Sequence, residues 1–159
     1  MPAPKSILFP TDFSEQSEAA IPFVKEWSQR FGASVHLLHI LDTGLMLSEY
    51  SWADYAPREL EEQREKQVRA ELEKLRGELA LGDVECRLEM KHGVAYEEIA
   101  RYAENESIDL IIMATHGRTG LSHLLVGSTT ERVVRISRCP VLTVRADSLS
   151  TGKETRAAG

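Results

Sequence analysis

The chain has 159 residues, of which 42% are hydrophobic and 28% are charged, values typical of a globular protein rather than a disordered or fibrous one. This length predicts one domain around one core and excludes two large domains. With 25 acidic against 19 basic side chains the net charge is -6, and such a surface repels polyanions. We therefore expect neither a nucleic acid nor a membrane as a partner.

Cysteine usage and the start of the chain predict a cytoplasmic protein. The two cysteines, Cys86 and Cys139, lack a close spacing such as Cys-x-x-Cys, so we expect reduced thiols. The first apolar run, residues 7–9, is too short for a signal peptide or a membrane span. We expect a single domain over residues 1–146 and a disordered tail over residues 147–159.

The first predicted elements are a strand and a helix. The apolar run Ser6–Phe9 predicts a short strand that is buried on both faces. Apolar residues at helical spacing predict a helix over Ser14–Phe31, with Ser14 as its N-cap. Pro22 lies inside this helix, and its ring clashes with the carbonyl four residues earlier. We therefore expect a kink near Glu18 rather than loss of the helix.

A second strand and a long charged helix come next. Ser34–Leu41 is apolar except for His36 and His39, which we interpret as structural. Residues 42–57 show no clean period, and two interpretations remain open, a binding lid or packing over the edge of the core. Arg58–Leu79 predicts a surface helix that docks through one apolar stripe. The stripe consists of Leu60, Val68, Leu72, Leu75 and Leu79.

The second half of the chain continues this alternation of strands and helices. Val84–Met90 alternates apolar and charged residues, the pattern of a half-exposed edge strand. A helix follows Gly93, and Ile108–Met113 is an apolar central strand. The last predicted elements are a helix over Ser128–Ser137 and a strand over Pro140–Arg145.

Regular alternation of strands and helices predicts a doubly wound α/β fold. We expect a five-stranded parallel sheet with helices on both faces and strand order 3-2-1-4-5. Ligands of such sheets bind beyond the carboxyl ends of the strands, where the strand order reverses. Two segments are predicted to meet there: Pro10-Thr11-Asp12 after the first strand and Ala114–Thr129 after the fourth.

Glycines punctuate the second of these segments. Gly117, Gly120 and Gly127 let the backbone approach a ligand and take positive φ, so that successive N–H groups form a nest for an anion. Gly127 leads into a helix with Ser128 and Thr129, which brings N–H groups, hydroxyls and the positive end of the helix dipole together. The segment therefore predicts phosphate binding, although neither the P-loop nor the GxGxxG pattern is present.

The sequence resembles the universal stress protein family from Ser6 to Arg145. The nucleotide-binding branch of that family carries Gly, two residues, Gly, nine residues and then Gly-Ser or Gly-Thr. Here Gly117 is followed by nine residues and then by Gly127-Ser128. The first glycine of the pattern falls on Ala114, a departure that keeps the backbone N–H and bears on affinity more than on the existence of the site.

This resemblance implies an ATP site at the switch point and a homodimer. Asp12 would contact adenine or ribose, the backbone of Ile40 would meet adenine, and Met113 would border the sugar. Mg²⁺ or Mn²⁺ would be held mainly by the phosphates. The dimer would form through the exposed edge of the last strand, Val141, Leu142, Thr143 and Val144, an apolar edge without charged blockers. The residues expected at the nucleotide are Pro10, Thr11, Asp12, Ile40, Met113, Ala114, Gly117, Arg118, Gly120, Gly127, Ser128 and Thr129.

Three of these residues keep a simpler alternative. Ser128 and Glu131 have the spacing of a capping box, which explains Ser128 without a ligand. Asp12 either caps the following helix or contacts the nucleoside. Arg118 either neutralises phosphate charge or faces water.

The leading hypothesis is a cytoplasmic ATP-binding stress-response protein in which the nucleotide is a switch or stabiliser, with slow hydrolysis at most. One alternative is a protein-interaction module of the same fold that does not bind nucleotide, with residues 42–57 as part of its contact surface. Another is a nucleotidyl or phosphoryl transferase that depends on Asp12 or His116. No second residue is spaced to position a nucleophile beside His116 or His123, so no catalytic residue is assigned. The histidines and cysteines are scattered, so no metal-ligating side chain is assigned either.

Overall fold

The computed structural model describes residues 3–42, 58–115 and 127–145. Their strands form one five-stranded parallel sheet in the order β3-β2-β1-β4-β5, as predicted. The strands are β1 (Ser6–Pro10), β2 (Ser34–Asp42), β3 (Cys86–Gly93), β4 (Leu110–Ala114) and β5 (Val141–Val144). The helices are α1 (Glu15–Glu18), α2 (Ile21–Phe31), α4 (Arg58–Leu79), α5 (Ala95–Asn105) and α6 (Ser128–Ile136).

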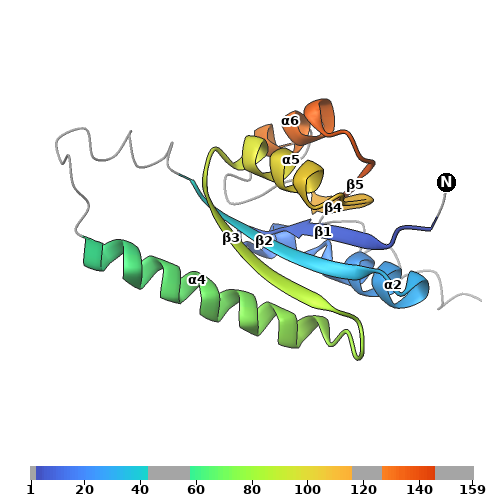
Figure 1. The fold of residues 1–159 in the computed structure, drawn as a ribbon, viewed down its shortest axis with the longest axis horizontal. Coiled ribbons are helices and arrows are strands. Elements are labelled where there is room, and N and C mark those ends of the chain that lie inside the picture. Colours follow the sequence, from blue (N-terminus) through green and yellow to red (C-terminus); the bar gives the residue numbers. More distant parts are fainter. Residues whose placement is uncertain (1–2, 43–57, 116–126, 146–159) are drawn as a thin grey trace, which may run out of the picture.

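Helices cover both faces of the sheet, so the predicted doubly wound arrangement is confirmed. Figure 1 shows α5 and α6 on one side of the strands and α4 on the other. Alternate residues of the strands enter two cores, since successive side chains point to opposite faces. Ile7 and Phe9 of β1 pack with α2 and α4, whereas Leu8 packs with α5 and α6. This three-layer construction leaves the ends of the strands, rather than the faces, available to a ligand.

The predicted helix over residues 14–31 is two helices, α1 and α2. The prediction placed the disturbance correctly, since α1 ends at Glu18, but a kink was wrong because the helix stops and restarts. Pro22 lies in the first turn of α2, where its missing N–H costs nothing. Gly32 ends α2 with a left-handed φ of 64°, the usual conformation of a residue just beyond a helix.

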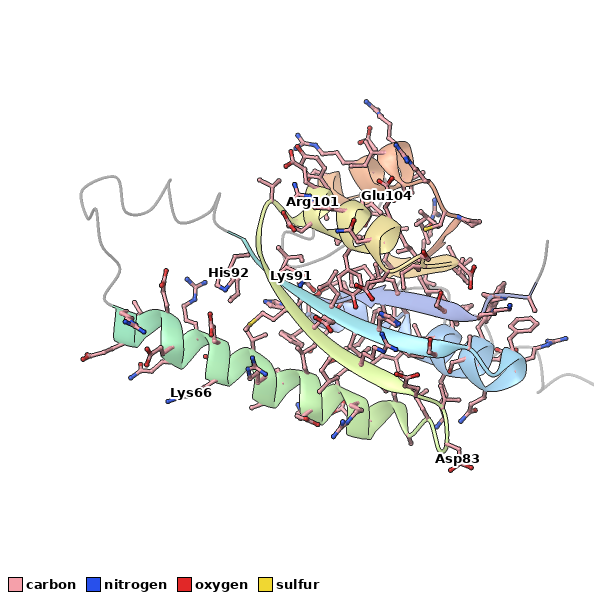
Figure 2. All side chains as sticks on the ribbon, viewed as in Figure 1. Lys66, Asp83, Lys91, His92, Arg101 and Glu104 are labelled. Carbon is pink, nitrogen blue, oxygen red and sulfur yellow. The ribbon has the colours of Figure 1, made fainter. Side chains whose placement is uncertain are left out.

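Helix α4 docks by its C-terminal half only. Val68, Leu72, Leu75 and Leu79 of the predicted stripe are buried, but Leu60 is 45% exposed. The first turns of α4 extend beyond the sheet in Figure 1, which explains why Leu60 has little to pack against. Figure 2 shows Lys66 pointing away from the sheet and His92, at the end of β3, above α4. No helix in the described part of the chain combines the length and the apolar character that a membrane span requires.

Strand β3 is an edge strand, as its alternating pattern predicts. It begins two residues later than predicted, at Cys86, and extends to Gly93, pairing with β2 along its whole length. Cys86 and Cys139 are free thiols in partly buried positions. Burial raises the pKa of the Cys86 thiol to about 11, so this group is protonated and unreactive at neutral pH.

Candidate functional site

The strand order reverses between β1 and β4. Strand β1 pairs with β2 on one side and with β4 on the other, and all three run in the same direction. Pro10, the last residue of β1, pairs with Leu38, so β2 continues past the end of β1 to Ile40 and beyond. The register of β1 with β4, extended by two residues from Leu8 and Ile111, places Pro10 level with Met113. These carboxyl ends form the floor of the candidate site.

A tight turn joins β1 to α1 and carries Asp12. The N–H of Ser14 and its hydroxyl both donate to Asp12 Oδ1, at 3.1 Å and 2.6 Å. Ser14 in turn accepts from the N–H of Ser17 at 3.1 Å, so Ser14 is the N-cap of α1, as predicted. Asp12 therefore does not cap the helix itself. It orients the residue that does, and a carboxylate has further acceptor positions for a ligand.

The turn is strained at Phe13, the residue after Asp12. Phe13 has a φ of 60°, which costs a non-glycine residue roughly 1–2 kcal/mol. Its N–H donates to Thr11 Oγ1 at 3.0 Å, and its ring stacks on His39 with centroids 4.5 Å apart. His39 is buried in β2, and its Nδ1–H donates to the carbonyl of Thr11 at 2.8 Å. The neighbouring strand thus holds the turn in its strained conformation.

His36 occupies a different environment on the same strand. It is buried on the α5 side, with Nδ1 hydrogen-bonded to the Tyr102 hydroxyl at 2.8 Å. The sequence analysis interpreted both histidines as structural, and the buried bond to Tyr102 agrees with this for His36. For His39 the interpretation is incomplete, because the bond to Thr11 links His39 to the candidate site. A sequence period shows which face of a strand a histidine occupies but not which carbonyl it reaches.

Burial, helped by the positive charge of Arg87, lowers the pKa of His36 below the ordinary value for a histidine. We expect the unfolded chain to bind a proton at His36 below about pH 6.5, while the folded protein binds it only at lower pH. Stability therefore falls as pH drops from 6.5 toward the folded pKa, and the loss levels off below it. Comparing urea unfolding of the protein and of His36→Asn at pH 7.5 and 5.5 checks this. An equal pH slope in both proteins would contradict it.

The other wall of the site is the junction of β4 with α6. The N–H of Thr115 donates to the carbonyl of Val144, and the N–H of Gly127 donates to the carbonyl of Thr115 at 2.6 Å. The buried hydroxyl of Thr130 donates to the carbonyl of Ala114 at 2.8 Å. The start of α6 is thereby held against the carboxyl end of β4. The sequence patterns did not identify Thr130, because a threonine in a first helical turn has many ordinary roles.

Helix α6 begins without a side-chain cap. Gly127 is its N-cap, and the Gly127 carbonyl accepts the N–H of Glu131 at 3.0 Å. The predicted capping box is therefore wrong: Ser128 is the first residue inside the helix, and the Glu131 carboxylate pairs with Arg135 at 2.8 Å. The first N–H groups of a helix have no partner within it, and among the described residues the N-cap Gly127 supplies no side chain to accept from them.

The structure brings most of the predicted site residues to one end of the sheet. Those at strand ends and in the turn are Pro10, Thr11, Asp12, Ile40, Met113 and Ala114, and those at the start of α6 are Gly127, Ser128 and Thr129. Ala114 is the last residue of β4 and is extended and paired in register with Val144, so its backbone does not require glycine. Gly117, Arg118 and Gly120 lie outside the described residues, as do His116 and His123.

Among the described residues, cation-binding side chains do not gather at this end. In residues 3–42, 58–115 and 127–145, no group of three or more His, Cys, Asp and Glu side chains has the arrangement to hold a metal ion. Within the described part of the chain, the N–H groups and hydroxyls at the start of α6 have the chemistry to bind an anion. The Asp12 carboxylate, across the switch point, favours a hydrogen-bond donor.

Comparison with known proteins identifies the family. The family model "Universal stress protein family" matches residues 4–145. The chain belongs to this family. The universal stress protein MJ0577 of Methanocaldococcus jannaschii is 33% identical over 153 residues, covering 89% of this chain and 94% of that protein. The match thus spans the whole sheet and both segments that meet at the switch point.

Solved structures of universal stress proteins share the fold. The structure of MJ0577 has a TM-score of 0.75 and 36% identity, covering 90% of this chain and 96% of that one. UspA from Lactobacillus plantarum has a TM-score of 0.73 at 25% identity, covering 89% and 97%. A universal stress protein in complex with cAMP has a TM-score of 0.66 at 19% identity, covering 91% and 99%. The strand order seen here is therefore that of the family.

Proposed function

We propose that this universal stress protein binds ATP with Mg²⁺ or Mn²⁺ at the switch point, as a cytoplasmic homodimer. The nucleotide acts as a switch or a stabiliser, and hydrolysis is slow at most. The cation is held mainly by phosphate oxygens, with no dedicated set of protein ligands. The proposal applies to all twelve residues expected at the nucleotide, including those outside the described residues.

One observation carries the proposal, the uncapped start of α6. Gly127 has φ −56° and ψ 145°, a conformation open to any residue, so the backbone does not demand glycine there. An N-cap usually carries a side-chain acceptor, and this one has none. Glycine is an accepted N-cap residue, and without a Cβ it also lets a ligand approach the backbone closely. The positive end of the helix dipole makes that ligand an anion, such as a phosphate.

The opposite side of the switch point suits the nucleoside. Met113 is buried, and Ile40 packs partly buried in the same apolar cluster, which gives an adenine ring apolar contacts. Asp12 lies beyond the end of β1, and its carboxylate is already oriented by Ser14. Carboxylate oxygens accept hydrogen bonds from ribose hydroxyls or from the adenine amino group. A base and a phosphate chain thus have complementary surroundings on the two walls.

The homodimer rests on the position of β5. This strand lies at the edge of the sheet, with β4 as its one neighbour in the sheet. Val141 and Leu142 are partly exposed and Thr143 is exposed, whereas Val144 faces the core. An apolar edge with open N–H and carbonyl groups pairs readily with a second strand.

A related structure also supports the choice of nucleotide. The universal stress protein solved in complex with cAMP holds an adenine nucleotide.

The first experiment is identification by mass of any nucleotide carried by the purified protein, followed by calorimetric titration with ATP and Mg²⁺. We expect binding at micromolar affinity and, on prolonged incubation, little ADP. The titration is repeated with EDTA, and the proposed role of the cation predicts weaker binding. No binding up to millimolar ATP would overturn the proposal and favour the interaction module. Rapid product accumulation would favour the transferase instead.

A further inference from the structure

Among the described side chains of β2, His39 forms a hydrogen bond with the turn that carries Asp12. Its Nδ1–H donates to the Thr11 carbonyl at 2.8 Å, and its ring stacks on Phe13 with an interplanar angle of 19°. A carbonyl only accepts hydrogen bonds, so Nδ1 carries the proton in this arrangement. His39 thus grips the turn at two points, the residue before Asp12 and the residue after it.

The turn contains a strained residue, Phe13, that contacts from outside the turn can stabilise. Phe13 is held at a φ of 60°, a left-handed conformation that non-glycine residues adopt only where surrounding structure enforces it. Phe13 directly follows Asp12 in the short segment between β1 and α1, so its backbone conformation sets the course of the chain beside Asp12. Hydrogen bonds inside the segment, from Phe13 to Thr11 Oγ1 and from Ser14 to Asp12, are local and move with it. The contacts with His39 come from a neighbouring strand and fix the segment to the sheet.

We propose that His39 is a positioning residue for the nucleotide site: its bond to Thr11 and its stack on Phe13 hold Asp12 where the nucleoside binds. This inference rests on the proposed function and deepens it. His39 need not touch the nucleotide. Its effect passes through the backbone of Thr11 and Phe13, so loss of the grip releases the Asp12 carboxylate from one orientation into several, and binding weakens.

His36 supplies a matched control. It lies on the same strand, is also buried and also donates or accepts through Nδ1, but its partner is Tyr102 on α5. Replacing either histidine by phenylalanine keeps an aromatic ring and removes the buried hydrogen bond through Nδ1. The two variants therefore carry a similar structural defect. Only His39→Phe acts on the turn.

The test measures two quantities in the full-length protein. One is the dissociation constant of ATP with Mg²⁺, and the other is amide hydrogen exchange over residues 11–17. We expect His39→Phe to weaken ATP binding about tenfold and to speed exchange at Phe13 and Ser14 about tenfold. His36→Phe should leave both quantities unchanged even where its melting temperature falls. His39→Asn keeps an N–H donor near the position of Nδ1 but loses the stacked ring, so it should restore part of the affinity.

A variant on the turn keeps the test decisive if His39→Phe does not fold. Phe13→Gly accepts the positive φ but removes the stacked ring, and it should also speed exchange over residues 11–17. Equal exchange and equal affinity in His39→Phe and His36→Phe would overturn the proposal. If the unaltered protein binds no ATP, the proposed function fails, and the exchange measurement still decides whether His39 holds the turn.

Discussion

Gly127→Val should abolish ATP binding while the protein keeps its fold. A valine at this N-cap places two methyl groups where the proposed phosphate approaches the N–H groups of Ser128 and Thr129. Hydrogen bonds to charged groups contribute about 1.5–3 kcal/mol each, so loss of two weakens binding about 100-fold or more. Calorimetric titration with ATP and Mg²⁺ measures the loss directly.

The fold should survive because the Gly127 backbone suits valine. Its φ of −56° and ψ of 145° are common for β-branched residues, and its N–H still donates to the Thr115 carbonyl. The circular dichroism of the variant should therefore match that of the protein, and its melting temperature should fall by a few degrees because valine is a poorer N-cap residue than glycine. A variant that binds ATP with unchanged affinity would show that the anion site is not at the start of α6.

Two other glycine variants bracket this result. Gly127→Ala adds a single methyl group and should weaken binding less than valine does. Gly77→Val changes a glycine of α4 that has no atom of the described chain within 4 Å of an added Cβ, far along the chain from the site. Gly77→Val should leave the affinity for ATP unchanged because Gly77 is far from the site. Valine has a higher helix propensity than glycine, so the stability of this variant should be equal or slightly higher. Loss of affinity in Gly77→Val would point to a general effect of the substitution.

The layered fold could be predicted because its signals are local and strong. Apolar runs such as that of β1 and the leucine stripe of α4 mark burial directly, and their alternation leaves few topologies. Pro22 also marked the break between α1 and α2, although not its extent. Whether a helix kinks or restarts at a proline depends on how its neighbours pack, here Ala19 and Ala20, which lie just before Pro22 and are buried in the core. Periodicity does not contain that information.

The candidate site was predictable in its location but not in its supporting contacts. Glycine spacing and strand order placed the start of α6 beside the turn of Asp12. The positioning contacts join residues distant in sequence, such as His39 with Thr11, and no local pattern reveals them. Ser128 shows the opposite error: its spacing to Glu131 fits a capping box, but the helix begins one residue earlier than that box requires, with Gly127 as its N-cap. A one-residue shift in a helix start moves Glu131 away from the position that a capping box needs.

Phe9→Ala should cost about 3–5 kcal/mol of unfolding free energy, the usual loss for a large aromatic side chain removed from a core. Phe9 is fully buried in the central strand β1, on the face covered by α2 and α4. Phe31→Ala is the matched control, because Phe31 is 39% exposed at the end of α2 and touches Trp27 edge-on. Its loss should cost about 1 kcal/mol. Urea unfolding compares the two, and equal losses would contradict the assignment of the core.

Phe9→Ala also tests whether the nucleotide acts as a stabiliser. A ligand that binds only the folded state adds about 2.7 kcal/mol at a concentration of 100 times its dissociation constant. Saturating ATP and Mg²⁺ should therefore recover much of the stability that Phe9→Ala loses, with a midpoint that rises with the logarithm of ATP concentration. In the double variant Phe9→Ala with Gly127→Val, ATP should recover nothing, because the fold defect remains and the binding site is gone. Equal recovery in both would mean that ATP stabilises the protein from a site other than the switch point.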